Sequence, residues 1–486
     1  MENYTGIGTT TPRESVYLWV EEPKARGTLG ILIFCLTTLI VCVWSALHFD
    51  IPQKRHSKRG RMAFGVAWMV VAVLCPEGLL ASAIYQRIDA SILEGYAPLY
   101  LQSETRVDTG WLTRVLKRFL GKAGGNEVSS LYFPYTSTSR SSQKDLELNI
   151  NMKAPRKRQY PFGLIHAIYA TMGGFAFNIP AGSDAGERHT VPNSKAFLYI
   201  MENFPDIIPD ISEESITDRA ESSPLSKALL IVQVGWFCAN SLLRLIQHLP
   251  LSLLEVSTAA HSFCTLITYF VWWSKPQNIA EATPMKGQRA REVHALLMCS
   301  GREYSEALSM AQRTVAGDPL TVTNSNDQGR IVLAANALRH RLPRLEEPPP
   351  EDPFYAPLWS SSPGSFGCSL SKSNRYDIIP CILTTLLYGL PHFLGWNELF
   401  PTPLECQFWR VSTCVVTWSG FIFIILVKLG VSFDHVRASQ IAALLLFLLY
   451  IMASGFLVGE SLRQLLFLDP AAYQVASWSS YWPHFS

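Results

Sequence analysis

Long apolar windows alternate with polar segments along this chain of 486 residues. A helix rises about 1.5 Å per residue, so roughly 20 apolar residues cross a hydrocarbon core of about 30 Å. Eight windows reach or approach this length: 29–48, 62–85, 162–180, 227–247, 250–273, 376–396, 409–429 and 439–467. The third is the weakest, because FGLIHAIYATMGGFAFNIP is short and contains a glycine pair. The pattern predicts an all-α polytopic transmembrane bundle of about eight spans.

The polar segments divide these spans into two groups. The predicted organisation is an N-terminal segment (1–28), five spans (29–273) with loops at 86–161 and 181–226, a helical insertion with a proline-rich linker (274–375), three spans (376–467) and an aromatic tail (468–486). None of the polar segments is expected to form a domain with its own core. We interpret them as loops and one small helical insertion.

Composition and charge placement agree with a membrane protein. The chain is 48% hydrophobic and only 16% charged. The loop DIPQKRHSKRGR, after the first window, holds five Lys and Arg residues, and such residues collect in short cytoplasmic loops. Alternation from that loop predicts a lumenal N-terminus and tail and a cytosolic 274–375 insertion, in a protein of the endoplasmic reticulum. The sequon Asn3-Tyr4-Thr5 falls on the predicted lumenal side.

The fourth window carries a polar and aromatic stripe. At helical spacing, one face holds Gln233, Trp236, Asn240, Arg244 and Gln247. Lipid cannot satisfy such a stripe, so it is expected to face other helices or a wet cavity.

The fifth window, within PLSLLEVSTAAHSFCTLITYFVWWSKP, carries an acid and a histidine into the apolar region. Glu255 lies near its start, His261 near its middle and Tyr269 near its end. Because the turn at 248–250 is short, the fourth and fifth windows should form an antiparallel hairpin that brings Arg244 towards Glu255.

Other windows carry ionisable residues at a similar predicted depth. Glu77 follows Pro76 in the second window, His166 shares a face with Tyr169 in the third, and His392 lies near the end of the sixth. We expect these groups to line one pocket in the lumenal half of the bundle.

A buried carboxylic acid stays protonated near neutrality, and aromatic ring faces stabilise cations. These are the requirements of proton-initiated cyclisation of a polyprenyl chain. The candidate catalytic residues are Glu255, Glu77 and His261. The candidate substrate-binding residues are Trp236, Asn240, Arg244, Tyr269, His166, Tyr169 and His392. The structural alternatives are an Arg244–Glu255 ion pair, a helix-packing hydrogen bond for Glu77, and packing roles for the histidines.

Several enzyme classes lack their motifs in this sequence. The eleven histidines form no H-x-x-x-H or H-x-x-H-H set of the kind that membrane desaturases use for iron. Aspartate-rich Mg²⁺ motifs, the D-x-D-D acid motif, P-loops and Rossmann glycine patterns are missing too. We therefore expect no metal and no cofactor.

Segments including VCVWSALHFDIP, PFGLIHAIYATMGGFAF and SKALLIVQVGWFCANSLLRLIQHLPLSLLEVSTAAHSFC resemble a large group of polytopic fungal membrane proteins. Some proteins of this kind accompany meroterpenoid biosynthesis as integral-membrane terpene cyclases. The resemblance implies a cyclase of secondary metabolism that acts on a farnesylated substrate or its epoxide, and it transfers no site residue.

Two hypotheses follow from these observations. In the first, Glu255 or Glu77 protonates the terminal alkene or epoxide of an apolar prenylated molecule, and His261 removes the last proton. In the second, the protein is a transporter or channel whose path is lined by Glu77 and the stripe of the fourth window. Membrane lipid is an expected partner in both, nucleic acid is not, and the oligomeric state is left open.

Overall fold

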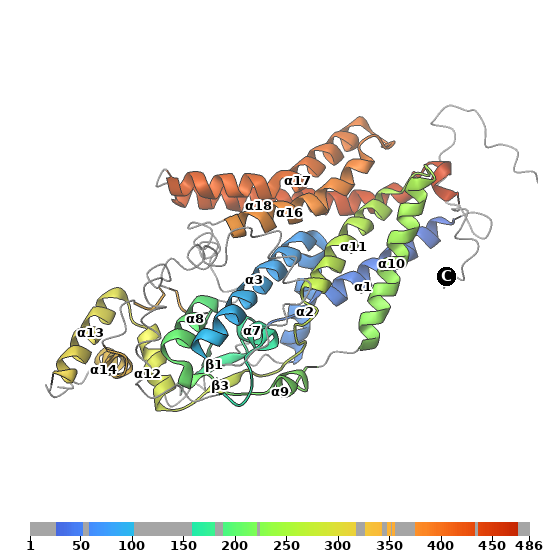
Figure 1. Ribbon diagram of the computed structural model, residues 1–486. Helices are drawn as coiled ribbons and strands as arrows, with labels where there is room; N and C mark the ends of the chain where they lie inside the picture. Colours follow the sequence, from blue (N-terminus) through green and yellow to red (C-terminus); the bar gives the residue numbers. More distant parts are fainter. Residues whose placement is uncertain are drawn as a thin grey trace, which may run out of the picture.

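The computed structural model describes residues 26–51, 58–101, 158–179, 188–220, 224–316, 326–342, 348–350, 352–354, 375–432 and 436–474. It is mainly helical, with a helical bundle at one end of the molecule and a small mixed α/β unit at the other (Figure 1). Five helices are long and apolar enough to cross a membrane. Some predicted features lie outside the described residues. They are the sequon, most of the 86–161 loop, most of the proline-rich linker and the end of the aromatic tail.

Six helical elements run roughly along the length of the bundle. They are α1 (Thr28–Ala46), α10 (Pro224–Ile246), α11 (Leu253–Val271), α16 (Arg375–Gly389) with its 3₁₀ extension η3 (Leu390–Gly395), α17 (Pro403–Ser432) and α18 (Val436–Arg463). Two short 3₁₀ turns follow, η4 (Gln464–Leu466) and η5 (Pro470–Tyr473). The outer helices carry many exposed leucine, isoleucine and phenylalanine side chains, as a lipid-facing surface requires.

Helix α11 lies at the centre of this bundle. It contacts α1, α3, α10, α16 and α18, and most of its side chains are buried. The helices around it therefore shield its polar residues from lipid. This arrangement explains how the chain can place Glu255 and His261 in an apolar window.

The second predicted span is broken. Helices α2 (Lys58–Leu74) and α3 (Pro76–Tyr100) meet at Cys75 with a bend of 104°. Pro76 cannot donate the backbone hydrogen bond that a continuous helix would need there, which accounts for the position of the break. We call the segment from Val73 to Glu77 the elbow.

Both ends of the α2–α3 pair lie near the α/β unit. Ile51, just before α2, donates a backbone hydrogen bond to Met172 (3.0 Å), and Leu93 and Ala97 of α3 belong to the core of the unit. The chain therefore leaves the α/β unit at Ile51, turns at the elbow and comes back to the unit along α3.

The prediction of a third membrane span was wrong. Residues 162–180 form α7 (Leu164–Thr171), only eight residues long, and strand β1 (Phe175–Ile179). Gly173, at φ 89°, makes the turn between them, in a backbone conformation that suits glycine. The eight-span count is not confirmed.

The α/β unit joins segments that were predicted to be separate loops. A three-stranded sheet has the order β2-β1-β3, with β2 (Arg188–Thr190) antiparallel and β3 (Thr283–Met285) parallel to β1. Its helices are α8 (Ser194–Asn203), η2 (Pro205–Ile207), α9 (Glu213–Thr217), α12 (Gln288–Leu297), α13 (Gly301–Val315) and α14 (Asn326–Arg339). These elements enclose the largest cluster of buried apolar residues in the described chain. The polar segments thus contribute to one core that they share with α3 and α7, which the expectation for each segment alone did not foresee.

The two ends of the bundle are defined by contacts. At one end, Lys275 after α11 donates to Asp50 after α1 (2.8 Å), next to the α/β unit. At the other end, the start of α1 meets η5 through the Arg26 backbone N–H and the Tyr473 carbonyl (2.8 Å). Asp50 and Ile51, the described start of the basic loop, and the 248–250 turn thus lie at opposite ends of the bundle, as predicted. The described flanks of the 86–161 and 181–226 loops, which an alternation of eight spans would put on opposite sides, lie at the same end.

Candidate functional site

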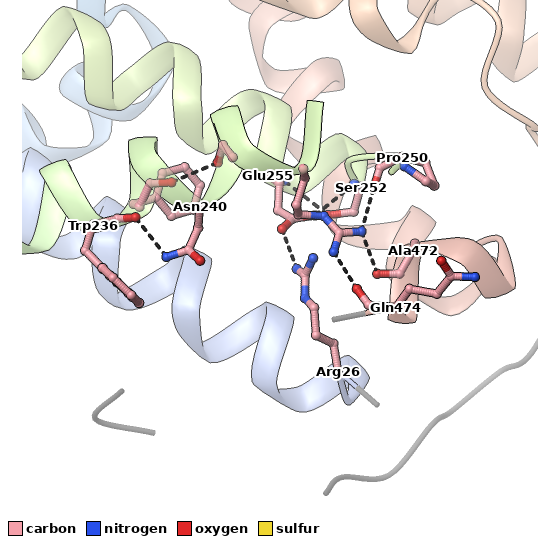
Figure 2. A network of polar contacts seen from close by, with 11 residues as sticks. Arg26, Trp236, Asn240, Pro250, Ser252, Glu255, Ala472 and Gln474 are labelled. Atoms are coloured by element: carbon pink, nitrogen blue, oxygen red, sulfur yellow. Dashed lines mark hydrogen bonds and ion pairs between the residues drawn. The ribbon is translucent and has the colours of Figure 1, made fainter. Parts of the chain in front are cut away.

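Glu255 is held by a set of polar contacts at the start of α11 (Figure 2). One carboxylate oxygen forms an ion pair with the Arg26 guanidinium. The other accepts hydrogen bonds from the backbone N–H and the hydroxyl of Ser252, both at 3.0 Å. Ser252 in turn caps the Glu255 backbone N–H, which completes a capping box at this helix start.

Arg244 interacts electrostatically with the same carboxylate but donates its hydrogen bonds elsewhere. Its guanidinium donates to the backbone carbonyls of Pro250 (2.7 Å), Ala472 (3.0 Å) and Gln474 (2.7 Å). The predicted hairpin therefore brings Arg244 close to Glu255, while Arg26 supplies the hydrogen-bonded ion pair. Both oxygens of Glu255 are engaged, so this residue is arranged as an anchor between α1 and α11.

The elbow leaves backbone carbonyls that the interrupted helix cannot satisfy. Side chains of two neighbouring helices satisfy them instead. The Val73 carbonyl lies 2.6 Å from Nε2 of His261 on α11. The Leu74 carbonyl accepts from the Tyr450 hydroxyl (3.1 Å) and the Ser454 hydroxyl (2.6 Å) on α18. The break is thus a built feature of the bundle interior.

Glu77 lies just after the elbow, in the first turn of α3, and is 4% exposed. One carboxyl oxygen accepts a weak hydrogen bond from the Cys75 thiol (3.4 Å). The other oxygen is buried and meets no donor at full hydrogen-bond geometry, while the Tyr450 hydroxyl and the Glu77 backbone N–H lie beside the carboxyl group. No ion pair reaches Glu77 within the described part of the chain. The partial positive charge at the start of α3 favours negative charge at this place.

Two tyrosines surround this carboxyl group. Tyr388 on α16 and Tyr450 on α18 belong with Leu80 of α3 to one buried cluster, and both rings lie within electrostatic range of Glu77. The Tyr388 hydroxyl is buried and has no hydrogen-bond partner among the described residues. We call Glu77, His261, Tyr388, Tyr450 and Ser454 the elbow site.

His392 lies next to the elbow site and is fully buried. The Tyr388 ring stands between His261 and His392, with ring centroids 5.1 Å from each. Nδ1 of His392 lies 3.0 Å from the Tyr388 carbonyl, which can only accept, so this nitrogen carries the hydrogen. Nε2 of a neutral His392 is then an acceptor, and it faces the Ser257 hydroxyl at 3.4 Å.

His261 differs from His392 in its hydrogen bonds. Nδ1 lies 2.8 Å from the Ser257 carbonyl and Nε2 lies 2.6 Å from the Val73 carbonyl. Both nitrogens therefore face acceptors, so neither is free to take a proton from a substrate. The arrangement makes His261 a clamp between α11 and the elbow.

The predicted residues of α10 and the far end of α11 do not join the elbow site. Trp236 and Asn240 are half-buried, and the Asn240 amide donates to the Trp236 carbonyl of the preceding turn (2.9 Å; Figure 2). Tyr269 packs edge-on against His48 and Trp273, near the α/β unit.

His166 and Tyr169 belong to the α/β unit, because the third predicted span is not a span. His166 Nε2 meets the Ile211 carbonyl (2.9 Å), and the Tyr169 hydroxyl meets the Thr283 hydroxyl (3.0 Å). Burial lowers the pKa of His166. Both residues tie α7 to neighbouring segments of the unit.

Of the predicted residues, Glu77, His261 and His392 come together. Sequence reasoning missed Tyr388, Tyr450, Ser454 and Ser257, which complete the arrangement. The sequence did contain a signal for these residues, because a tyrosine or serine hydroxyl within an apolar window needs a hydrogen-bond partner inside the protein. These residues are common in membrane helices, so they did not stand out from the printed sequence.

Comparison with known proteins places the chain in a family. It matches the model described as Family of unknown function (DUF8562) over residues 4–109 and 136–319, and it belongs to that family. The matched ranges include Glu77 and His261, whereas Tyr388, His392 and Tyr450 lie beyond them. No curated protein and no solved structure matches the chain.

Proposed function

We propose that this member of the family is a membrane-embedded terpene cyclase in which Glu77 is the proton donor. The observation that carries the proposal is the state of Glu77: a buried carboxyl group that has no ion pair within the described residues and one oxygen that meets no donor there at full hydrogen-bond geometry. Burial without a countercharge favours the neutral acid, which has a proton to give. Glu255 lacks this property because it is paired with Arg26.

The surroundings of Glu77 suit proton donation to an apolar molecule. After the proton leaves, the start of α3 stabilises the carboxylate that remains. The ring faces of Tyr388 and Tyr450 would stabilise the carbocation that forms on the substrate. The proton adds to the terminal alkene carbon or the epoxide oxygen, and the carbon–carbon bonds of the rings then form as the cation moves along the chain.

The last proton needs an acceptor in the same layer. We assign this role to His392 in place of His261, because Nε2 of His392 is an acceptor while both nitrogens of His261 face carbonyls. His261 becomes a positioning residue that holds the elbow. The prenylated substrate class rests on the sequence resemblance described above.

Product analysis in a host tests the proposal. The protein is expressed in a fungal host that makes a farnesylated phenol and its epoxide, and products are compared for wild type, Glu77→Gln and Glu255→Gln. We expect cyclised product with wild type and a loss of about 100-fold or more with Glu77→Gln, within the range of general acid catalysis. Glu255→Gln, normalised to protein level, should retain cyclisation.

Two outcomes would count against the proposal. Unchanged substrate in the presence of well-expressed wild-type protein rejects the cyclase. Full cyclisation by Glu77→Gln rejects Glu77 as the donor while leaving the activity standing.

A second candidate function is supported by the broken α2–α3 pair. Interrupted helices that return to the same side, with backbone carbonyls in mid-bundle, form ion and substrate sites in many transporters. On this hypothesis Glu77 would bind a proton that moves with a solute. Reconstituted protein that carries protons across liposomes without any prenyl substrate, and loses this flux in Glu77→Gln, would favour transport over cyclisation.

A further inference from the structure

A row of buried polar side chains lies between α11 and α18. It runs from the elbow site towards the end of the bundle that lies away from the α/β unit. Ser257 Oγ lies 2.8 Å from Ser461 Oγ and 3.4 Å from Nε2 of His392. All three residues are at most 3% exposed. Polar groups in the interior of a membrane bundle are costly, and a continuous set of them marks a path or a site.

The hydrogen bonds of this row are not fully determined by the structure around it. Ser461 donates to the Leu457 carbonyl (2.6 Å), so its oxygen is available as an acceptor. Nε2 of His392 is an acceptor too, because Nδ1 carries the hydrogen. The single hydrogen of Ser257 therefore has two acceptors, one on each side, and can point to either.

The outer end of the row approaches a small pocket at the bundle end. The pocket is lined by residues that include Ser252, Leu253, Glu398 and Gln464. Gln464 follows Ser461 by three residues at the end of α18, so the two side chains lie on the same side of the chain. Burial raises the pKa of Glu398, which lines the pocket, and the nearby charge of Asp469 adds to the effect.

The inner end of the row meets Glu77. His392 contacts the Tyr388 ring, and the unpartnered Tyr388 hydroxyl lies within electrostatic range of the Glu77 carboxyl group. Hydrogen bonds therefore join Ser461, Ser257 and His392, and the Tyr388 ring lies between His392 and Glu77.

We propose that Ser461, Ser257 and His392 form a proton relay that connects the pocket at the bundle end with Glu77. The inference rests on the proposed function. Within a turnover, the proton that His392 takes from the product can return to Glu77, and the row supplies a proton from water when Glu77 has lost its own without that return. A proton from water adds to Ser461 oxygen as Ser461 passes a hydrogen to Ser257. Ser257 passes its hydrogen to Nε2 of His392, and the resulting imidazolium delivers a proton to the Glu77 carboxylate past Tyr388. Each group ends with the hydrogens it had at the start, and Glu77 gains one.

Infrared spectroscopy of the full-length protein in lipid tests the relay without any substrate. The C=O stretch of the protonated Glu77 carboxyl is identified as the band that Glu77→Gln removes, and its shift is followed after transfer to D₂O. We expect deuterium uptake to slow about tenfold or more in Ser257→Ala and in Ser461→Ala, since each removes one donor from the row. Ser262→Ala is the matched control, because Ser262 is an equally buried hydroxyl on α11 that contacts Cys42 instead.

The possible results separate the relay from the function. If wild type shows no carboxylic-acid band that depends on Glu77, the resting acid is missing and the proposed function fails. If the band is present and Ser257→Ala, Ser461→Ala and Ser262→Ala all exchange at the wild-type rate, the relay is rejected while the acid stands. Slow exchange in both relay variants with a normal rate in Ser262→Ala supports the relay.

Discussion

Two buried glutamates in the same bundle are accommodated in opposite ways. Glu255, at the start of α11, has an ion pair with Arg26 and two hydrogen bonds from Ser252. Glu77, after the elbow, has one weak contact from Cys75 and an oxygen that meets no donor at full hydrogen-bond geometry in the described chain. The exposed fractions of the two residues, 3% and 4%, are almost equal.

The difference shows that the degree of burial does not by itself determine the role of a carboxyl group. Charge next to Glu255 makes it a structural anion, which ties α1 to α11. The lack of charge next to Glu77 makes the neutral acid the favoured form there. The following substitutions are ordered by the size of the expected effect and test this contrast.

The largest effect is expected at Glu255. Glu255→Ala leaves Arg26 and the neighbouring Arg244 without a counter-anion, and breaking a buried pair costs about 3–5 kcal/mol. The free energy of unfolding in detergent micelles measures the loss. Glu77→Gln is the control and should cost less than about 1 kcal/mol, since no charge pair is lost. Equal losses at both positions would contradict the contrast.

The next effect concerns the clamp on the elbow. His261→Leu leaves the Val73 carbonyl at the elbow without its imidazole partner, at about 1–3 kcal/mol for an unsatisfied group. The elbow should loosen, so the Cys75 thiol should react faster with a maleimide reagent. Phe263→Leu is a matched control on the same helix, because Phe263 is 43% exposed on the lipid-facing side. Unchanged labelling of Cys75 in His261→Leu would show that the elbow holds without the clamp.

Two serines permit a finer comparison of the same regions. Ser252→Ala removes the cap beneath Glu255, and Ser454→Ala removes a hydrogen bond to the Leu74 carbonyl. Each should reduce stability by about 1 kcal/mol. Only Ser454→Ala should change the Cys75 labelling rate. If Ser252→Ala changes it equally, the two regions are coupled and the contrast between them fails.

At neutral pH the smallest effect is expected in the α/β unit, where half-buried His294 has no countercharge among the described residues. It lies between the Phe177 and Phe354 rings, and burial lowers its pKa to about 4 from an ordinary value of 6.5. Between these pH values the unfolded chain binds more protons than the folded one, so stability should fall as pH falls from about 6.5 towards 4.

The pH dependence of thermal unfolding measures this effect. His294→Gln removes the titrating group and should flatten the decline between pH 6.5 and 4. An unchanged slope would mean that other groups control the acid response. The result would then give no evidence, outside the bundle, that burial alone favours the neutral form of an ionisable side chain.

Much of the bundle could be predicted from the sequence. The apolar windows identified α1, α10, α16, α17 and α18, because the length and hydropathy of a lipid-facing helix are properties of its own residues. The hairpin of α10 and α11 followed from the short turn at 248–250. The proximity of Arg244 to Glu255 followed from that hairpin.

The errors share one physical origin. Residues 162–180 are as apolar as a span, but they are buried in protein instead of lipid, and hydropathy is the same in both cases. The choice depended on partners far away in sequence, such as β3, which pairs with β1 across more than a hundred residues. Placing Tyr169 and His166 in the bundle was a consequence of this error.

The sequence alone determined that the chain enters a membrane and that it carries Glu77, His261 and His392 into apolar surroundings, because composition and periodicity are local. Only the tertiary structure decided which carboxyl group has a charged partner. Arg26 reaches Glu255 across 229 residues, while Glu77 receives no such partner within the described chain. An ion pair in the interior depends on helix packing, and packing distance cannot be read from spacing along the chain.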